Sequence, residues 1–269
     1  MTWKKWAFRL LWAIMYVSGP FALIYGIMHQ EWFWLMGTLL MIPIVGGGFG
    51  ADIALHRYLT HRSFQTTKFK HILMSLAAFM SGQGSAIHYA CVHRHHHRHS
   101  DKDKDVHCPR NQGIIDSGFM WMTRDLIPII DRDIKLSVRD LLSDPLNKFL
   151  DVWYYHLWLM IIVVGSIISW KALLFLILAP ASKGYLEIFL TNTLMHTKTS
   201  GSYRNFDTDD CSQNRRWYSW FCLGQGMHNN HHACPGAYHL KLAPNDVDPA
   251  GDFIEKFLLE KNQSKIYNF

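Results

Sequence analysis

The chain has 269 residues, and its 27 Lys and Arg outnumber its 21 Asp and Glu, which gives a formal net charge of +6. This length predicts one domain or a small helical bundle. The mean hydropathy of −0.03 looks like that of a soluble protein, but it averages very apolar stretches with a polar remainder rich in histidine. Membrane topology accounts for the positive charge, as set out below, so nucleic-acid binding is not an expected function.

Four long apolar stretches dominate the hydropathy pattern, at about residues 10–28, 32–55, 152–169 and 172–194. A helix that crosses the hydrocarbon core of about 30 Å needs about 20 apolar residues, so each stretch is long enough to span a membrane. The first is not a secretory signal peptide, because it lacks a small-residue cleavage site and a second span follows at once. The sequence therefore predicts an all-α protein built on a four-helix transmembrane bundle.

Lysine and arginine are distributed unequally between the two ends of these spans. Residues 57–148 carry 14 of them and residues 197–269 carry 8, whereas the two short loops on the opposite side hold only Lys171. Three more cations precede the first span, namely Lys4, Lys5 and Arg9. By the positive-inside rule, both termini are cytoplasmic. Residues 56–150 and 195–269 then form a cytoplasmic helical cap, and we expect a multi-pass protein of the bacterial inner membrane.

Three histidine boxes stand at the ends of apolar stretches. The first is His56-x4-His61, and the other two have the spacing HX2HH. The histidines of these two boxes are His93, His96, His97, His228, His231 and His232. In an HX2HH box the three positions share one helical face. His56 and His61 would lie about 140° apart on a regular α-helix, so they must point differently or the helix must end between them. Imidazoles bind iron, zinc, copper or nickel, so the boxes predict a metal centre at a membrane face without naming the metal.

Other segments are less regular. Two apolar pieces bracket the second box, His71–Val92 and Gly118–Ile130, and we expect both to be helices in or near the membrane interface. The charged C-terminal tail ends in a short amphipathic helix at Phe253–Leu259. The five cysteines lack paired metal spacing, so we expect free thiols in a reducing cytosol. Asn262-Gln-Ser264 is a glycosylation sequon by pattern only, because this topology keeps it cytoplasmic.

The boxes and their surroundings resemble the membrane fatty-acyl desaturases, in particular the branch related to the stearoyl-CoA (delta-9) desaturases. The matching stretches lie between Gly48 and Pro235 and include HRYLTHRSF, HRHHHRHSDKDKDVHCP and GQGMHNNHHACP. A further match is Asn192-Thr-Leu-Met-His196. The resemblance implies one desaturase domain over residues 1–269. It also implies an O2-dependent oxidoreductase that introduces a cis double bond into a saturated acyl chain at a di-iron centre.

The same resemblance implies which residues hold the two irons. Nine histidines are the expected ligands: His56, His61, His93, His96, His97, His196, His228, His231 and His232. Asn192 is expected to contribute through a water. Asp52 stands one helical turn before His56, and it either accepts the outer N–H of a ligand histidine or lies at the interface. Asp105 and His107 are expected to support the ligands from outside.

Several other polar residues have a simpler interpretation. His95 falls between ligand positions and His99 lies two residues beyond His97, so both should point away from the irons. Lys183 and Glu187, four residues apart in the fourth span, are expected to form an ion pair.

The second span leads to His56, so its residues are candidates to line an apolar tunnel for the acyl chain. We expect Ile44, Gly47 and Gly48 to line it, and bulk at Gly48 to shorten the accepted chain. The alternative is that Gly46–Gly50 is only a close-packing face between helices.

The chemical carrier of the acyl chain stays open. Vertebrate members have Arg-Asp directly before the second box, where this chain has Cys91-Val92, and their Gly-Glu-Gly is Gly224-Gln-Gly226 here. The substrate is therefore a thioester of CoA, a thioester of a carrier protein, or a lipid-linked chain. Candidate phosphate contacts are Arg124, Arg204, Arg215 and Arg216. With no credible flavin or nicotinamide motif, the electrons must come from a separate donor of the ferredoxin, rubredoxin or cytochrome b5 type.

Two other functions remain in view. A hydroxylase or acetylenase on the same scaffold would use the same oxidant and differ only after the first hydrogen abstraction. A histidine-rich metal transporter would also bind metal, but it would place its ligands near the bilayer midplane, whereas these boxes gather at one face.

Overall fold

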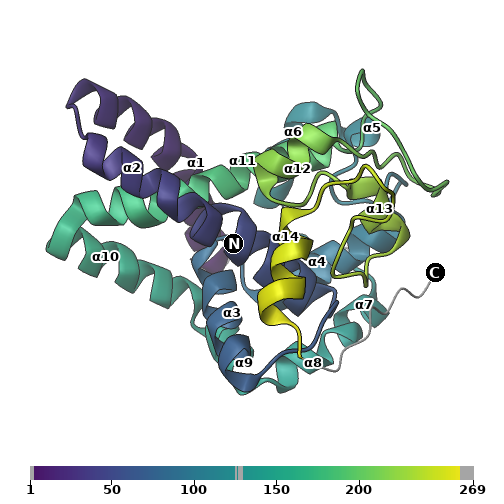
Figure 1. The fold of residues 1–269 in the computed structure, drawn as a ribbon. Helices are drawn as coiled ribbons and strands as arrows, with labels where there is room; N and C mark the ends of the chain where they lie inside the picture. Colours follow the sequence, from purple (N-terminus) through teal and green to yellow (C-terminus); the bar gives the residue numbers. More distant parts are fainter. Residues whose placement is uncertain (1–2, 125, 127–129, 261–269) are drawn as a thin grey trace.

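The computed structural model describes residues 3–124, 126 and 130–260, and within these residues it contains helices and no β-strand. The predicted all-α class is therefore confirmed. The helices are α1 (Trp3–Met28), α2 (Trp32–Met41), η1 (Ile42–Gly46), η2 (Gly48–Thr60), α3 (Lys68–Met80), α4 (Ala86–His99), α5 (Pro109–Gln112), α6 (Ile114–Gly118), η3 (Met120–Thr123), α7 (Arg132–Ser137), α8 (Arg139–Ser143), α9 (Pro145–Val152), α10 (Tyr154–Leu173), η4 (Leu174–Leu178), α11 (Ala179–Leu194), α12 (Arg216–Cys222), α13 (His228–Ala233), α14 (Pro249–Phe253) and η5 (Ile254–Leu258). Figure 1 shows α1, α2, α10 and α11 projecting as long arms from a cap of shorter helices.

Three helical runs are long and apolar enough to cross a membrane, Trp3–Met28, Trp32–Thr60 and Tyr154–Leu194. The third is 41 residues long, about twice the length that a single span needs. Ser169 within it has non-helical dihedral angles (φ −162°, ψ 97°), and α10 and α11 extend as separate arms in Figure 1. The two apolar stretches predicted at 152–169 and 172–194 thus belong to one bent helical run.

The second run changes its winding on the way to the histidines. It is α-helical up to Met41 and π-helical in η1 and η2, with a break at Gly47 (φ −108°, ψ −90°). Pro43 has no N–H to donate, which disturbs regular α-helical bonding here. A Cβ on Gly46 would clash with the carbonyl of Pro180 in α11. The small residues of this segment therefore allow two helices to pack closely.

The π-helical winding brings the first two histidines together. A π-helix closes i to i+5 hydrogen bonds, and the backbone N–H of His61 donates to the carbonyl of His56 at 3.0 Å. The two residues consequently lie one turn apart, and their ring centroids are 4.7 Å from each other. On a regular α-helix the two side chains would diverge unless the helix ended between them, and the structure shows both a different pitch and a helix end at Thr60.

The segment expected as one helix at His71–Val92 forms two, α3 and α4. The chain turns between them at Gly82 (φ 76°) and Gly84 (φ 102°), where the left-handed conformation favours glycine. Ser85 then caps α4, because its hydroxyl accepts a hydrogen bond from the N–H of His88 at 3.2 Å. This cap fixes the start of the helix that carries the second box.

The other segments predicted from the sequence are confirmed only in part. In the stretch Gly118–Ile130 the structure describes the last residue of α6 and the short turn η3. Residues 125 and 127–129 fall outside the described residues, so the expected helix over this whole stretch stays a prediction. The C-terminal helix is present as α14 and η5, and it begins four residues before Phe253. All five cysteines are free thiols. Asn262-Gln-Ser264 lies outside the described residues.

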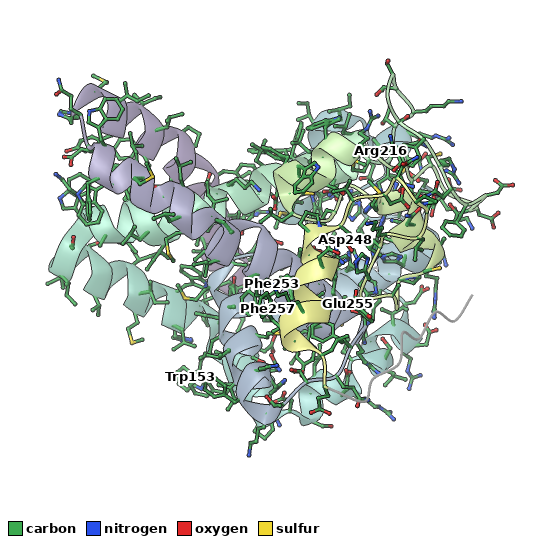
Figure 2. All side chains as sticks on the ribbon, viewed as in Figure 1. Trp153, Arg216, Asp248, Phe253, Glu255 and Phe257 are labelled. Carbon is green, nitrogen blue, oxygen red and sulfur yellow. The ribbon has the colours of Figure 1, made fainter. Side chains whose placement is uncertain are left out.

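Polar and apolar side chains are segregated over the molecule. Large apolar residues are strongly exposed on the long arms, for example Phe33 (81%) in α2 and Ile167 (79%) in α10. Figure 2 shows nitrogen- and oxygen-bearing side chains gathered on the cap, while the arms carry mostly carbon. An exposed apolar surface of this extent suits contact with lipid.

Candidate metal centre

The structure gathers all nine predicted histidines into two clusters. The five-histidine cluster contains His56, His61, His93, His97 and His231, and the four-histidine cluster contains His96, His196, His228 and His232. The helices α4 and α13 each contribute to both clusters, because the i, i+3 and i+4 positions of their boxes share one helical face. The helix η2 serves only the first cluster, and the end of α11 serves only the second.

Four side chains of the five-histidine cluster form a closed ring of Nε2 atoms. The Nε2 of His56 lies 3.0 Å from that of His93 and 3.1 Å from that of His231. The Nε2 of His97 completes the ring, at 3.0 Å from His93 and 2.9 Å from His231. The centre of a square with such edges is about 2.1 Å from each corner, which is the length of a metal–imidazole bond. These residues therefore fit a metal ion.

His61 stands apart from the ring at nearly equal distances. Its ring centroid is 4.7 to 4.9 Å from those of the other four histidines. Its Nε2 is buried and has no hydrogen-bond partner among the described residues. A buried, unpartnered imidazole nitrogen is costly, and a metal ion bound by the ring would supply the missing partner.

The four-histidine cluster is more open. The Nε2 of His228 lies 3.0 Å from that of His196 and 3.1 Å from that of His232. The ring of His96 packs beside the last two, with centroids 5.1 and 5.2 Å away. Asn192 is buried nearby and donates its side-chain N–H to the carbonyl of Ser117 at 3.1 Å. Its role through a water stays a prediction.

Carboxylates face the outer nitrogen, Nδ1, of four histidines. The pairs are Asp52–His56 at 3.1 Å, Asp105–His96 at 3.0 Å, Asp101–His196 at 2.8 Å and Asp210–His232 at 2.8 Å. A carboxylate in this position holds the proton on Nδ1, so the lone pair of Nε2 points to the cluster centre. Asp52 and Asp105 were predicted from the sequence, whereas Asp101 and Asp210 were not. Both missed residues stand in polar loops, where no periodicity marks them.

Burial sets the charge state of these groups. It lowers the pKa of His93, His97 and His231 well below the usual value, and the neighbouring imidazoles lower it further. Neutral imidazoles keep a lone pair for a metal. His96 differs, because burial lowers its pKa but the charge and hydrogen bond of Asp105, together with the charges of Asp101 and Asp210, outweigh that effect and raise it. Burial alone would raise the pKa of Asp105, yet His96 and His107 bring it below its usual range.

The third predicted supporting residue, His107, touches Asp105 through its backbone. Its N–H donates to the carboxylate at 3.1 Å, and its ring packs 4.2 Å from that of His96. Burial lowers the pKa of His107 to about 3. The Nδ1 of its ring is buried without a hydrogen-bond partner among the described residues.

Asp52 belongs to a buried network that reaches the C-terminal segment. Arg57 pairs with Asp52 at 3.0 Å and, through two nitrogens, with Asp248 at 2.7 and 2.8 Å. The side-chain amide of Gln225 donates to Asp52 at 2.6 Å and lies 2.8 Å from the Nδ1 of His56. Gly224 (φ 153°) leaves room for this network, because a Cβ there would come within 2.5 Å of Arg57. Asp52 is thus a structural partner of His56 and not an interfacial residue.

The polar residues that we expected to stay away from the clusters do so. His95 contacts the backbone of Lys104 at 3.0 Å, and His99 pairs with Asp131 at 2.7 Å. The Lys183–Glu187 ion pair is present.

Comparison with known proteins identifies the family to which a chain with this site belongs. Residues 31–248 match the family model described as fatty acid desaturase. The chain belongs to the fatty acid desaturase family. It is therefore a fatty-acyl desaturase, an oxidoreductase, and the resemblance seen in the histidine boxes is confirmed.

Individual relatives carry related activities in their names. The desaturase is 29% identical over 234 residues to the sn-1 stearoyl-lipid 9-desaturase of Anabaena variabilis, with 85% of this chain and 81% of the relative covered. It is 30% identical over 214 residues to Delta-9 acyl-lipid desaturase 2 of Arabidopsis thaliana, covering 76% and 65%. It is 26% identical over 221 residues to Acyl-CoA 5-desaturase AL21 of Anemone leveillei, covering 82% and 65%.

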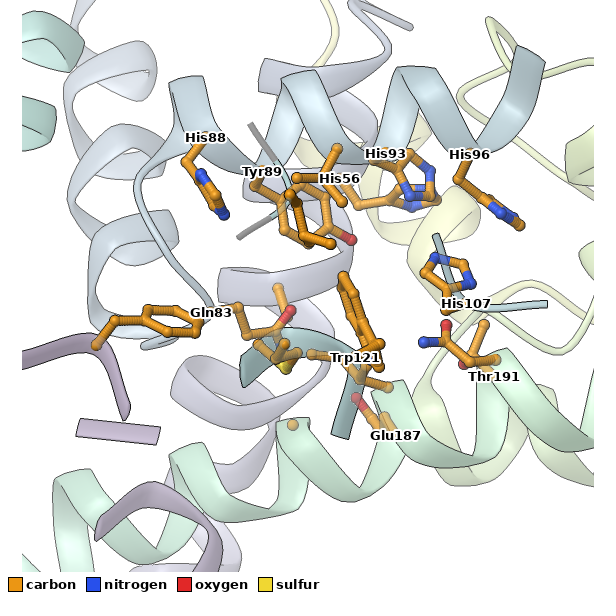
Figure 3. Close-up of a pocket in the computed structure, with 18 of the residues that line it drawn as sticks. His56, Gln83, His88, Tyr89, His93, His96, His107, Trp121, Glu187 and Thr191 are labelled. Atoms are coloured by element: carbon orange, nitrogen blue, oxygen red, sulfur yellow. The ribbon is translucent and has the colours of Figure 1, made fainter. Parts of the chain in front are cut away.

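A cavity of about 320 Å³ leads to the two clusters of the desaturase. One face of α4 lines it through His88, Tyr89, Val92, His93 and His96. Figure 3 shows the opposite wall, with His107, Trp121, Glu187 and Thr191. An elongated, largely apolar space beside the histidines suits an acyl chain.

The lining of this cavity differs from the residues expected to line the tunnel. Ile44, Gly47 and Gly48 are not among its lining residues, whereas Ala51 and Gly184 are. Ile44 is half exposed, and a Cβ on Gly48 would meet Leu223 at 2.7 Å. A Cβ on Gly47 would meet the carboxylate of Glu187, which lines the cavity, at 2.5 Å. The close contact at Gly48 favours the close-packing alternative there, and a tunnel role for Ile44, Gly47 and Gly48 stays a prediction. Of the four arginines considered as phosphate contacts, only Arg124 lines the cavity.

Proposed function

We propose that this desaturase is an O2-dependent enzyme that holds two irons, one in each histidine cluster, beside the acyl chain in the cavity. The closed ring of four Nε2 atoms supports this proposal most strongly, because its edges of 2.9 to 3.1 Å suit one metal ion surrounded by imidazoles. The expected ligands are the nine clustered histidines, with Asn192 acting through a water at the four-histidine cluster.

Bound iron would supply the strong oxidant, made from O2, that removal of two hydrogens from an unactivated methylene pair requires. The residues of the chain hold and orient the reactants. The Asp–His pairs aim the Nε2 lone pairs inward, and the walls of the cavity exclude water from the methylene pair. The ring of Tyr89 stacks on His93 with centroids 5.5 Å apart, which fixes one ligand candidate at the cavity wall.

The reaction balance requires a partner. A methylene pair, O2, two electrons and two protons give one double bond and two waters. The two electrons come from a separate ferredoxin, rubredoxin or cytochrome b5 type protein, since the sequence carries no credible motif for a flavin or nicotinamide.

For topology, we propose four spans, because the bend at Ser169 divides the third helical run into two arms. The cations that flank the arms support a cytoplasmic location for both termini and the cap, and the expected location is the bacterial inner membrane. The names of the relatives include lipid-linked and CoA-linked substrates and more than one double-bond position, so they leave both the carrier and the position open.

Fatty-acid analysis by mass spectrometry tests this function. Cells that express the chain should accumulate mono-unsaturated fatty acids, and cells that express His231→Ala should not. The His95→Ala variant is the control, because His95 stands among the box histidines of α4 but contacts the backbone carbonyl of Lys104 and the backbone N–H of Asp131. Hydroxylated or acetylenic products in place of alkenes would contradict desaturation and indicate another reaction on this scaffold.

A further inference from the structure

The outer end of the cavity is cationic. Lys4, Lys5 and Arg9 of α1 line it together with Arg124. Arg9 is held in place by two hydrogen bonds to the carbonyl of Thr123, at 3.0 and 3.3 Å. Asp116 pairs with Arg124 at 3.0 Å and offsets part of this charge. The two carboxylates among the lining residues, Asp52 and Glu187, are paired with Arg57 and Lys183.

This cationic end lies at the boundary between the arms and the cap. Lys4, Lys5 and Arg9 stand in the first turns of α1, a candidate span, and Tyr155, which also lines the cavity, stands at the start of another. Exposed tryptophans surround it, namely Trp3 (53%), Trp6 (61%) and Trp153 (47%). Tryptophan at helix ends marks the level of the lipid head groups. The cavity therefore opens where phosphate groups of a bilayer are found.

The tryptophans also contact the residues around the opening. The ring of Trp3 lies 6.2 Å from that of Tyr155, and the ammonium of Lys4 lies 6.0 Å from the ring of Trp3. The guanidinium of Arg9 lies 5.7 Å from the ring of Trp6. The cations are thereby tied to the aromatic side chains that face the head groups.

From this opening, the cavity runs beside α4 toward the histidines. His88 and His96 both line it, and the eight residues of helix from one to the other correspond to about 12 Å. Such a length admits a run of methylenes and leaves the group that carries the acyl chain outside, among the cations.

We propose that the outer end is a binding subsite for the phosphate of a membrane phospholipid. The phospholipid stays in the bilayer, Lys4 and Lys5 contact its phosphate, and one acyl chain enters the cavity sideways toward the clusters. This inference rests on the proposed function and names the carrier of its substrate. Phosphate oxygens suit ammonium and guanidinium donors.

A soluble CoA thioester fits this arrangement less well. Its nucleotide needs cations on the aqueous side of the cap, and two of the candidate arginines there are engaged in the fold. Arg215 is 2% exposed and donates to the carbonyls of Thr197 and Ser200. Arg204 donates to the carbonyls of Thr208, Asp210 and Ser212.

Photo-cross-linking tests the subsite. The full-length, iron-loaded protein in mixed micelles is irradiated with a phosphatidylglycerol that carries a diazirine in the middle of one acyl chain. We expect label on the α4 segment Tyr89–His96, displaced by excess dipalmitoyl phosphatidylglycerol and not by stearoyl-CoA or by acyl carrier protein loaded with stearate. Labelling should weaken as salt is raised, because exposed charges are screened.

Charge variants separate this subsite from general effects. The double variant Lys4→Gln/Lys5→Gln should lower labelling roughly tenfold, and Lys4→Arg/Lys5→Arg should restore it. The matched control is Lys68→Gln/Lys148→Gln, which removes two exposed cations from outside the cavity and should label like the wild type. Iron content, measured in every variant, reports folding.

Two results would overturn the subsite. One is wild-type labelling in Lys4→Gln/Lys5→Gln, and the other is displacement by stearoyl-CoA as effective as that by phosphatidylglycerol. Either result together with mono-unsaturated products in cells would refute the subsite alone, whereas an absence of such products would refute the proposed function.

Discussion

The two histidine clusters differ in how they are supported from outside. Among the described residues, His56 is the one member of the five-histidine cluster with a carboxylate, that of Asp52, on its outer nitrogen. In the four-histidine cluster three histidines have one, supplied by Asp101, Asp105 and Asp210. Carboxylates raise the basicity of the imidazoles they contact. The cluster with fewer imidazoles is therefore the one with more negative charge behind them.

The clusters also differ in the elements that build them. The five-histidine cluster takes its residues from η2, α4 and α13, so helical winding fixes their directions. The four-histidine cluster depends on His196, which follows α11, and on the loop residues Asp101, Asp105 and Asp210. We infer that the first cluster is held mainly by helix packing and the second mainly by hydrogen bonds between loops.

The largest effect is expected from removing one histidine of either cluster. His231→Ala in the first and His96→Ala in the second should each abolish desaturation and lower the iron content of the purified protein, because each loss opens a coordination position. His95→Ala should keep most of the activity, since its ring contacts the carbonyl of Lys104. Active His96→Ala beside inactive His95→Ala would overturn the assignment of the second box.

Removal of the supporting carboxylates should have the next largest effect. Asp101→Asn and Asp210→Asn should lower iron retention against a chelator by about 10–100-fold, and Asp52→Asn should act similarly at the other cluster. Asp103→Asn is the matched control, because this exposed residue lies in the same loop as Asp101. Wild-type iron retention in Asp210→Asn would show that the larger number of carboxylates around the four-histidine cluster does not affect iron binding.

A charge exchange would sharpen the contrast at the five-histidine cluster. Gln225→Glu places a second carboxylate beside Asp52, where the amide now donates at 2.6 Å, and like charges in a buried site repel. We expect roughly tenfold lower iron retention. The double variant Asp52→Asn/Gln225→Glu keeps a single carboxylate beside His56 and should recover most of it. No recovery would mean that the position of the carboxylate matters and not its charge alone.

The smallest effect concerns the pH dependence of stability without metal. Burial lowers the pKa of His61, His93 and His97 below 6.5 in the folded protein. Above pH 6.5 these rings are neutral in both states, and below it the unfolded chain binds more protons. The free energy of unfolding should therefore fall from pH 7 to 5, by about 1 kcal/mol per pH unit or more.

At the four-histidine cluster the raised pKa of His96 acts in the opposite direction, since its stabilising contribution is present at low pH and lost as pH rises. Thermal unfolding in detergent measures the net slope. His97→Gln should reduce it, and His96→Gln should make it steeper. A wild-type protein that becomes more stable from pH 7 to 5 would contradict this account.

The sequence predicted the residues of the clusters better than their geometry. Imidazoles at i, i+3 and i+4 share one helical face, so the sequence predicted that the histidines in α4 and α13 point to a common side. The proximity of His56 and His61 was not, because nothing in a spacing of five reveals π-helical winding. Asp101 and Asp210 approach from loops, where contacts depend on the fold and not on a repeat. The cavity lining depends on how distant segments pack, which no local pattern shows, so a tunnel role for Gly47 and Gly48 stays a prediction.

The central claim, one iron in each cluster, is tested most directly by the iron content of the purified protein. We predict about two irons per wild-type chain, and about one in a variant that loses His61 and His97, which belong only to the five-histidine cluster. A variant that loses His196 and His232 should also keep about one. A wild-type chain that saturates at a single iron, or a complete loss of iron in both variants, would contradict two separate sites.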